Sequence, residues 1–347
     1  MSAVQRPLAI TLGDPAGIGG EIIAKAFRDA PQLTQGCFVV GDLAHMRRAS
    51  AVLAAPGELA LPVALIDAPD DVQRIPPRCI PLLQVGTPAT GCVAWGQVDA
   101  AAGRIAADAV SWAARAALRG EIAGLVTAPL HKEALAAAGV SFPGHTELLQ
   151  AEAARHRGVA VADMPVRMML ANDELRTVLV SIHVALRAAI DAVTRQQVLQ
   201  TLRITHAALQ AMLGRAPRIA VAGLNPHAGE GGLFGREEIE AIVPAIQDAR
   251  AEGIDADGPH PPDTIFMRAR AGHGQPGGFD VVVAMYHDQG LIPVKYLGVE
   301  HGVNVTLGLP LVRTSPDHGT AFDIAGTGRA DAASLLQAIR TARELAR

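Results

Sequence analysis

The sequence predicts an α/β fold, because short apolar runs alternate with longer helical stretches along the chain. The apolar run Leu8–Leu12 enters a glycine-rich turn and then a helical stretch. Ile122–Val126 follows an alanine-rich helical stretch over residues 98–118, and Arg218–Leu224 precedes another over 236–252. With 347 residues, the chain is long enough for two domains of ordinary size.

Further segments fit the same architecture. The other predicted strands cover residues 37–40, 175–182 and 280–285, and the other predicted helices cover 132–138, 147–155, 196–213 and 331–346. The glycine-rich segment 269–278 is predicted to be an exposed loop. Half of the residues are hydrophobic but only 3% are aromatic, so the core must be built from Ala, Val, Leu and Ile.

Composition excludes several classes of protein. The formal net charge of -4 gives no basic surplus to attract nucleic acid. The three cysteines, Cys37, Cys79 and Cys92, are odd in number and show no CxxC spacing, which argues against a disulfide framework or a cysteine-rich zinc site. The N-terminus lacks the apolar core of a signal peptide, and the uncharged stretch 79–98 is broken by Pro and Gly. We therefore expect no membrane span and a cytoplasmic location.

Three predicted strands each run into a histidine. His183 follows VLVSI, His227 follows IAVAGLNP and His287 follows VVVAMY. Ligands of open α/β sheets bind beyond the carboxyl ends of strands, so three strands could deliver imidazoles to one edge. A site of three histidines leaves metal coordination positions open for substrate, and such a metal acts as a Lewis acid. Each histidine could instead be a local cap, and no HxxxH spacing supports a metal site.

Scarce and anion-binding residue types follow the third histidine. Lys295 is one of only three lysines, and its compact charge suits phosphate or carboxylate, although a solvated surface lysine is the common alternative. Farther along, Asn304 can donate and accept hydrogen bonds, and Arg313 can bind an anion with two nitrogens or form a surface ion pair. His318 and Asp323 lie in a glycine-containing loop.

Two weaker signals lie upstream. The segment 13–20, GDPAGIGG, follows a strand and could hold an anion at a helix start. It is not GxGxxG, and a tight turn from strand to helix explains it equally well. His145, Thr146 and Glu147 occur where a helix begins, so their side chains and the helix N-terminus could bind a ligand.

These motifs, in this order, resemble those of the 4-hydroxythreonine-4-phosphate dehydrogenase family of vitamin B6 biosynthesis. The matching pieces are GDPAGIGGEI at 13–22, TAPLHKEAL at 127–135, GHTELL at 144–149, LNPHAGEGG at 224–232, YHDQGLIPVKY at 286–296 and VNVTLGLPLVRTSPDHGTAFDIAG at 303–326. The resemblance implies a two-domain fold like that of isocitrate and isopropylmalate dehydrogenases, with three αβα layers and an active-site cleft between the domains. We expect the first domain to cover 1–138 and 327–347, and the second to cover 139–326.

The resemblance also implies roles for individual residues. His183, His227 and His287 would bind one divalent metal ion, with Zn, Mg, Mn and Co all open. The residues implied in substrate binding are His145, Thr146, Lys295, Asn304 and Arg313. Lys295 is also a candidate catalytic residue. The segment DHGTAFDIAG is similar to the cofactor loop of the related dehydrogenases, which makes His318, Gly319 and Asp323 candidates for binding NAD or NADP.

The implied reaction is NAD-dependent oxidation and decarboxylation of 4-phosphohydroxy-L-threonine to 3-amino-2-oxopropyl phosphate and CO2. The implied assembly is a homodimer whose interface lies in the second domain and includes the active site. A paralogue acting on D-threonate or D-erythronate 4-phosphate would share every metal ligand. A dihydrodiol dehydrogenase is a more distant alternative. An acyl- or phosphate-transferase on a related scaffold would need neither NAD nor the histidines, and a non-catalytic metal-binding module would leave Lys295 and Arg313 unexplained.

Overall fold

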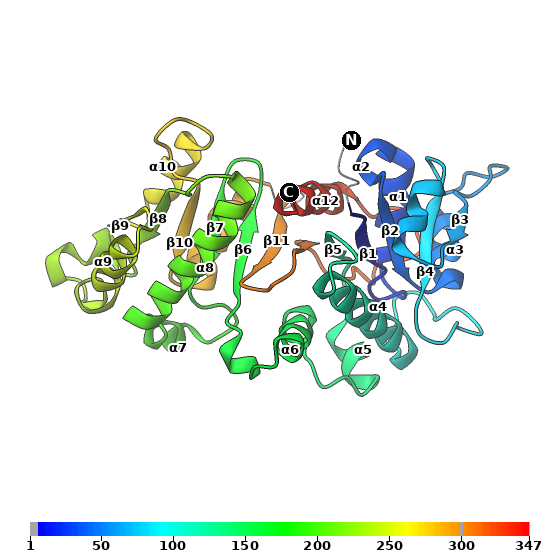
Figure 1. Ribbon diagram of the computed structural model, residues 1–347, viewed down its shortest axis with the longest axis horizontal. Helices are drawn as coiled ribbons and strands as arrows, with labels where there is room; N and C mark the ends of the chain where they lie inside the picture. Colours follow the sequence, from blue (N-terminus) through cyan, green and yellow to red (C-terminus); the bar gives the residue numbers. More distant parts are fainter. Residues whose placement is uncertain (1–5, 299–300, 347) are drawn as a thin grey trace. The chain divides into compact units, whose positions relative to one another are not determined.

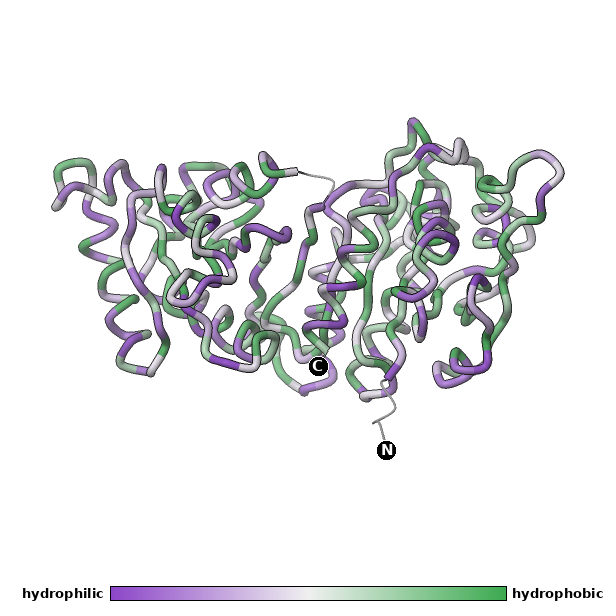
Figure 2. Tube along the Cα trace, turned by 90° about the horizontal axis from the view of Figure 1, so that it is seen from above, coloured by the Kyte–Doolittle hydropathy of each residue, from purple (hydrophilic) through white to green (hydrophobic). Residues whose placement is uncertain are grey.

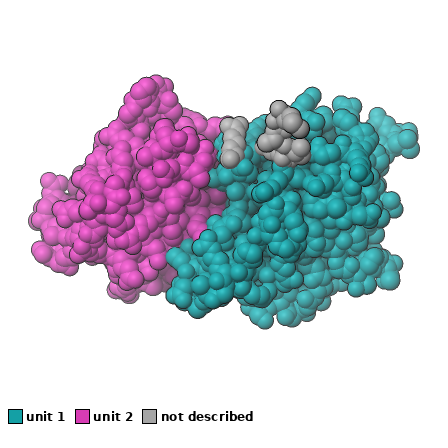
Figure 3. Space-filling view, in the orientation of Figure 1, with its two compact units in different colours: residues 1–165, 309–346 teal, residues 166–308, 347 magenta. Residues whose placement is uncertain are grey.

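A computed structural model describes residues 6–298 and 301–346 in two compact units (Figures 1 and 3). Unit 1 comprises residues up to 165 together with 309–346, and unit 2 comprises 166–308. These boundaries differ from those predicted after residues 138 and 326. Helix α6, His145–Arg157, packs on α4, Ala100–Leu118, and strand β12, Arg313–Pro316, pairs with β5, Gly124–Thr127, so α6 and β12 belong to unit 1.

Unit 1 contains a parallel sheet with the strand order β3-β4-β2-β1-β5-β12. Its other strands are β1 Leu8–Thr11, β2 Cys37–Gly41, β3 Val63–Leu65 and β4 Ile80–Gln84. Because these strands are parallel, the carboxyl ends of β1, β5 and β12 lie next to one another at one edge of the sheet. The polar segments that follow these three strands therefore meet there.

Helices cover both faces of this sheet, as the predicted αβα layers require. On one face, Ala9, Phe38 and Leu125 share a hydrophobic core with α4. On the other, the Thr314 hydroxyl of β12 donates to the Ala338 carbonyl of α12, Ala333–Leu345, at 2.8 Å. The remaining helices of unit 1 are α1 Gly19–Asp29, α2 Pro31–Thr34, α3 Leu43–Val52, η1 Pro69–Arg74, α5 Lys132–Ala137 and η2 Val161–Asp163.

Small residues let the helices of unit 1 approach closely. A Cβ atom on Gly103 of α4 would lie 2.0 Å from the Ala134 carbonyl oxygen of α5, far inside van der Waals contact. The alanine-rich composition of α4 thus brings it near both the sheet and α5. The core of unit 1 is therefore built from small and aliphatic side chains with few aromatics, as the composition predicted.

Unit 2 contains a mixed sheet with the strand order β11-β6-β7-β10-β8-β9. The pairs β11–β6 and β6–β7 are antiparallel, whereas β7, β10, β8 and β9 run parallel. The strands are β6 Arg167–Ala171, β7 Arg176–Leu179, β8 Ile219–Ala222, β9 Ala256–His260, β10 Val281–Ala284 and β11 Val303–Leu307. The carboxyl ends of β7, β10 and β8 therefore share one edge.

The helices of unit 2 pack on this sheet through apolar side chains. Helices α10, Ile265–Gly272, and α11, His287–Tyr296, enclose one core cluster with Val282 and Ala284. The others are α7 Leu186–Asp191, α8 Arg195–Leu213, η3 Pro226–Gly232, the π-helix η4 Glu238–Ile242 and α9 Val243–Ala251. Figure 2 shows that hydrophobic and hydrophilic positions are interspersed along the chain in both units. None of the described helices is long and apolar enough to cross a membrane.

The predicted strands and long helices are confirmed, with ends shifted by a few residues. One correction concerns the segment 269–278, predicted to be a loop throughout, because its first residues complete α10. Among the strands that the sequence analysis did not predict are β6, β9, β11 and β12. Strand β12 reads RTSP and β9 reads ADGPH, so neither has the apolar run or alternation on which strand prediction depends.

Candidate active site

The three histidines predicted to bind metal all follow neighbouring parallel strands of unit 2. His183 follows β7, His287 is the first residue of α11 after β10, and His227 lies in η3 after β8. The rings of His183 and His287 lie 5.6 Å apart between centroids. Within residues 6–298 and 301–346, no group of three His, Cys, Asp or Glu side chains is arranged to hold a metal ion. The structure thus pairs His183 with His287, and metal binding by all three histidines stays a prediction.

His287 is oriented by its neighbour in sequence. Its Nδ1 atom lies 2.8 Å from a carboxylate oxygen of Asp288, at the N-terminus of α11. A carboxylate on one ring nitrogen fixes the tautomer of a histidine and leaves the other nitrogen for a ligand. The His287 side chain is part-exposed.

His227 opens a left-handed turn. Its φ is 54°, and φ stays positive through Ala228 and Glu230 as well as through the glycines at 229 and 231. For each residue other than glycine, this conformation costs about 1–2 kcal/mol. The turn is therefore held by its surroundings, and such strained segments cluster at functional sites.

Two further residues with predicted roles lie in unit 2. Lys295 is exposed in the last turn of α11, the helix that begins at His287. Asn304 is half-buried in β11 and pairs in register with Leu170 of β6. Both remain candidate substrate-binding residues.

A buried cation forms the centre of a second polar group, in unit 1. Arg313 opens β12, is only 4% exposed, and donates through Nε and Nη2 to the Thr127 hydroxyl at 3.1 and 2.8 Å. Burial lowers the pKa of Arg313 to about 10, with the Glu147 carboxylate acting in the opposite direction, so the guanidinium stays charged at neutral pH. Thr127 was not predicted, although it ends a strand and begins the TAPLHK motif.

His145 accompanies Arg313 as a neutral donor or acceptor. Burial and then the nearby Arg313 charge lower the pKa of His145 well below its usual value. Its Nε2 atom is buried and has no hydrogen-bond partner among the described residues. His145 and Thr146 begin α6, as predicted, so backbone N–H groups of a helix N-terminus lie beside them. Charged Arg313, neutral His145 and a helix start together suit a phosphate or carboxylate.

Asp14 and His131 are residues that the sequence analysis did not single out. One Asp14 oxygen accepts from the Ala16 N–H at 2.8 Å, and the other is buried with no hydrogen-bond partner in the described part of the chain. Burial raises the pKa of Asp14 to about 6, opposed by the Ala16 N–H and by His131. Both residues follow strands, β1 and β5, and that position is the signal that could have identified them.

The predicted cofactor residues lie in the segment after β12. His318 is half-buried, while Gly319 and Asp323 are exposed. The Thr320 carbonyl accepts from the Ile18 N–H at 3.0 Å, which joins this segment to the glycine-rich turn 13–20. Phe322 stacks on His131 with ring centroids 4.7 Å apart. The segments after β1, β5 and β12 thus meet at one edge of unit 1.

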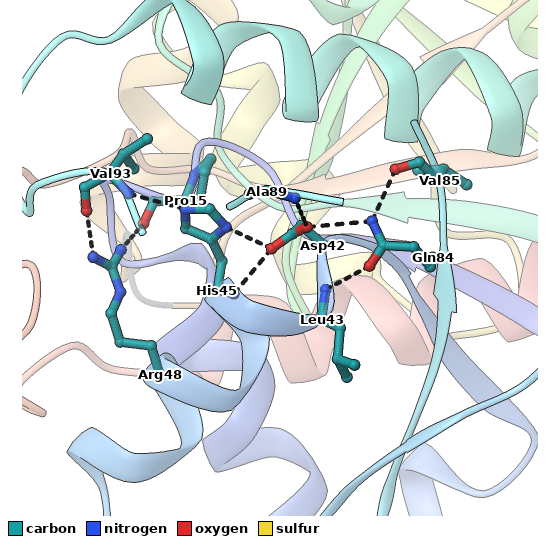
Figure 4. A network of polar contacts seen from close by, with 9 residues as sticks. All are labelled: Pro15, Asp42, Leu43, His45, Arg48, Gln84, Val85, Ala89 and Val93. Carbon is teal, nitrogen blue, oxygen red and sulfur yellow. Dashed lines mark hydrogen bonds and ion pairs between the residues drawn. The ribbon is translucent and has the colours of Figure 1, made fainter. Parts of the chain in front are cut away.

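A buried hydrogen-bond network supports the same edge (Figure 4). His45 lies 2.7 Å from Asp42 through Nδ1, and its Nε2 accepts from the Val93 N–H at 3.0 Å. Burial opposes ionisation of Asp42, but hydrogen bonds from Ala89 and His45 lower its pKa overall. Arg48 donates to the Pro15 carbonyl at 2.8 Å and also to the Val93 carbonyl. The network ties the loop around residue 93 to the turn that carries Asp14.

Comparison with known proteins agrees with this arrangement. A family model described as "Pyridoxal phosphate biosynthetic protein PdxA" matches residues 34–342. The chain belongs to this family. A 4-hydroxythreonine-4-phosphate dehydrogenase of Beijerinckia indica is 52% identical over 99% of this chain and 96% of the relative. A D-threonate 4-phosphate dehydrogenase of Salmonella typhimurium is 45% identical over 98% of this chain and 99% of the relative.

Solved structures of the family support the fold. A 4-hydroxythreonine-4-phosphate dehydrogenase from Klebsiella pneumoniae matches with a TM-score of 0.85 and 39% identity, covering 99% of this chain and 100% of that one. The family predicted from the motifs and the α/β fold are therefore confirmed.

Proposed function

We propose that this chain is an oxidoreductase that oxidises and decarboxylates 4-phosphohydroxy-L-threonine with NAD or NADP, giving 3-amino-2-oxopropyl phosphate and CO2. Family membership and 52% identity to a 4-hydroxythreonine-4-phosphate dehydrogenase along nearly the whole chain support this reaction. The observation that carries the proposal is the pairing of His183 and His287 at the carboxyl ends of neighbouring strands, with Asp288 orienting His287.

The donor chemistry of the three predicted histidines suits a divalent metal ion. His183, His227 and His287 would hold it, since imidazole nitrogens suit Zn and Co and the three side chains come from adjacent strands. A bound cation would supply Lewis acidity to the substrate oxygens. Asp288 would keep the Nδ1 of His287 occupied, so that Nε2 is the nitrogen offered to the ion. The identity of the metal is left open among Zn, Mg, Mn and Co.

Arg313 would bind the phosphate of the substrate. Its guanidinium is buried and positively charged, and Thr127 holds it in place, so it is preorganised for an anion. His145 and Thr146 would add hydrogen bonds from the start of α6. Lys295 and Asn304 are proposed as further substrate-binding residues, and Lys295 as a candidate proton carrier.

NAD or NADP, when bound, would supply the hydride acceptor. We assign its binding to the segment with His318, Gly319 and Asp323, because this segment joins the glycine-rich turn at the carboxyl edge of unit 1. An NAD or NADP molecule would find backbone groups there that glycine leaves accessible. We further propose that the enzyme works in the cytoplasm.

We also propose a homodimer. Large apolar side chains are exposed near the histidines of unit 2: Val184 is 53% exposed, Leu233 74% and Phe234 49%. Val184 follows His183 directly, and Phe234 lies 6.2 Å from the His227 ring between centroids. Clusters of exposed apolar residues mark interaction surfaces, and a second copy would cover these next to the histidines. Sedimentation of the purified chain tests this assembly.

A second substrate deserves a direct test, because the chain is also 45% identical to a D-threonate 4-phosphate dehydrogenase. The experiment follows NADH absorbance with each phosphorylated substrate, NAD and added divalent metal. A metal-dependent rise with 4-phosphohydroxythreonine that a chelator removes supports the main proposal. A rise only with threonate 4-phosphate would change the assigned substrate and leave the proposed active site unchanged. If NADH absorbance rises with neither substrate, the proposed reaction is refuted.

A further inference from the structure

The turn that carries His227 is anchored by a buried carboxylate. Glu238 is 2% exposed and opens the π-helix η4. One of its oxygens accepts from the backbone N–H groups of Leu224 and Asn225 at 2.7 and 2.8 Å. Its other oxygen accepts from the Asn225 side-chain amide at 2.9 Å. Both oxygens are therefore engaged by the residues that lead into the turn.

The same carboxylate also lies against the turn itself. A Cβ atom on Gly229 would lie 2.7 Å from a Glu238 oxygen, so no larger residue fits there without displacing the carboxylate. Gly229 sits within the run of positive φ that begins at His227. Short π-helical segments often occur at functional sites, which agrees with the place of η4 beneath this turn.

A second side chain joins the segments that follow β8 and β10. Gln289 lies two residues after His287 in α11. Its carbonyl oxygen accepts from the Met285 N–H at 2.7 Å, and its amide donates to the Gly223 carbonyl at 2.8 Å. Met285 follows β10 and Gly223 follows β8, so one side chain spans the two strand ends.

We propose that Glu238 and Gln289 are positioning residues that fix the positions of His227 and His287. They thereby determine how tightly the carboxyl edge of the unit 2 sheet binds a divalent cation. The inference rests on the proposed function, in which these histidines bind metal. Neither residue is offered as a ligand, because the polar atoms of both side chains already bond backbone or Asn225. Outer groups that orient metal ligands typically change metal affinity by about 10–100-fold when they are replaced.

The test measures binding of Co²⁺ alone to the full chain, by calorimetry and by the visible absorption of the bound ion. Glu238→Gln keeps the shape of the side chain but turns an amide N–H2 toward the Asn225 amide, so one hydrogen bond is replaced by a clash of donors. Gln289→Met removes both hydrogen bonds at similar volume. We expect each variant to bind Co²⁺ about 10–100-fold more weakly and to show an altered absorption spectrum at saturation.

The matched control is Glu240→Gln, which makes the same charge change in the same π-helix at an exposed side chain. It should bind Co²⁺ as the unaltered chain does. If Glu238→Gln fails to fold, Gln289→Met remains as the second variant, since it leaves Glu238 and the left-handed turn unaltered.

The outcomes separate this inference from the function on which it rests. If the unaltered chain does not bind Co²⁺, the metal site of the proposed function is refuted, and the inference with it. If the unaltered chain binds Co²⁺ and the folded variants bind it with unchanged affinity and spectrum, only the positioning role is overturned. Lower thermal stability with unchanged Co²⁺ binding would likewise assign Glu238 and Gln289 a purely structural role.

Discussion

Replacing Asp14 by Asn should change the pH dependence of stability. Burial raises the pKa of Asp14 from 3.8 to about 6 in the folded chain. Ionisation of Asp14 therefore opposes folding. The destabilisation is absent below the pKa that Asp14 has in the unfolded chain, grows as pH rises, and is complete above the pKa that it has in the folded chain. A shift of this size corresponds to about 3 kcal/mol over the whole range, since one pKa unit is worth 1.36 kcal/mol.

The measurable part lies at moderate pH. Between about pH 5 and about pH 8, the linkage relation predicts that ionisation of Asp14 lowers the free energy of unfolding by a further ~1.4 kcal/mol, about half of the total. Asn does not titrate, so the stability of Asp14→Asn relative to the unaltered chain should become more favourable by about that amount over this interval. The fixed cost of placing an amide at this site is the same at both pH values and cancels in the comparison.

Urea unfolding at several pH values provides the assay, with the midpoints of both chains compared at each pH. The exposed Asp67→Asn is the control, and its stability relative to the unaltered chain should change little over the same interval. A difference between Asp14→Asn and the unaltered chain that stays constant from about pH 5 to about pH 8 would refute the reasoning. Asp14 would then ionise at the same pH in the folded and the unfolded chain.

Three other predictions follow from contacts described above. Arg313→Lys keeps the charge but loses the paired donation to Thr127, so KM for the phosphorylated substrate should rise at least about tenfold in steady-state assays. Gly103→Ala should destabilise the chain by about 1–3 kcal/mol, because the added Cβ would overlap the Ala134 carbonyl. Gly91→Ala is the control, since a Cβ there meets nothing within 4 Å and should not destabilise the chain. Thermal unfolding compares the two variants. His45→Ala should destabilise by about 2–4 kcal/mol in urea unfolding, because it removes one hydrogen bond from the buried Asp42 carboxylate and leaves the Val93 N–H without its acceptor; a loss below about 0.5 kcal/mol would contradict that account.

The positions of the histidines could be predicted because two simple rules act together. Buried parallel strands read as continuous apolar runs, and the residues after them gather at one edge. VLVSI, IAVAGLNP and VVVAMY obey both rules, so His183, His227 and His287 were found from the sequence alone. The start of α6 at His145 could likewise be predicted, because polar residues precede an apolar run there.

Other parts of the site could not be found in this way. Strand β12 is polar at three of its four residues, so nothing in RTSP predicts a strand, and its pairing with β5 in the folded chain is what reveals it. Glu238 stands 13 residues beyond Asn225, and no local spacing links the two. The left-handed turn includes Ala228 and Glu230, residue types that give no sign of positive φ. These features depend on tertiary contacts, which outweigh local preference.

The network around His45 has a consequence for how unit 1 opens. Because the Val93 N–H donates to the Nε2 of His45 while Nδ1 faces Asp42, the ring bridges a loop and the end of β2. The Ala89 N–H bonds the same carboxylate. These two amides lie in a segment without regular secondary structure, where exchange with solvent is ordinarily fast. Here their hydrogen exchange should be as slow as that of the sheet, so this loop opens only when the strands themselves separate.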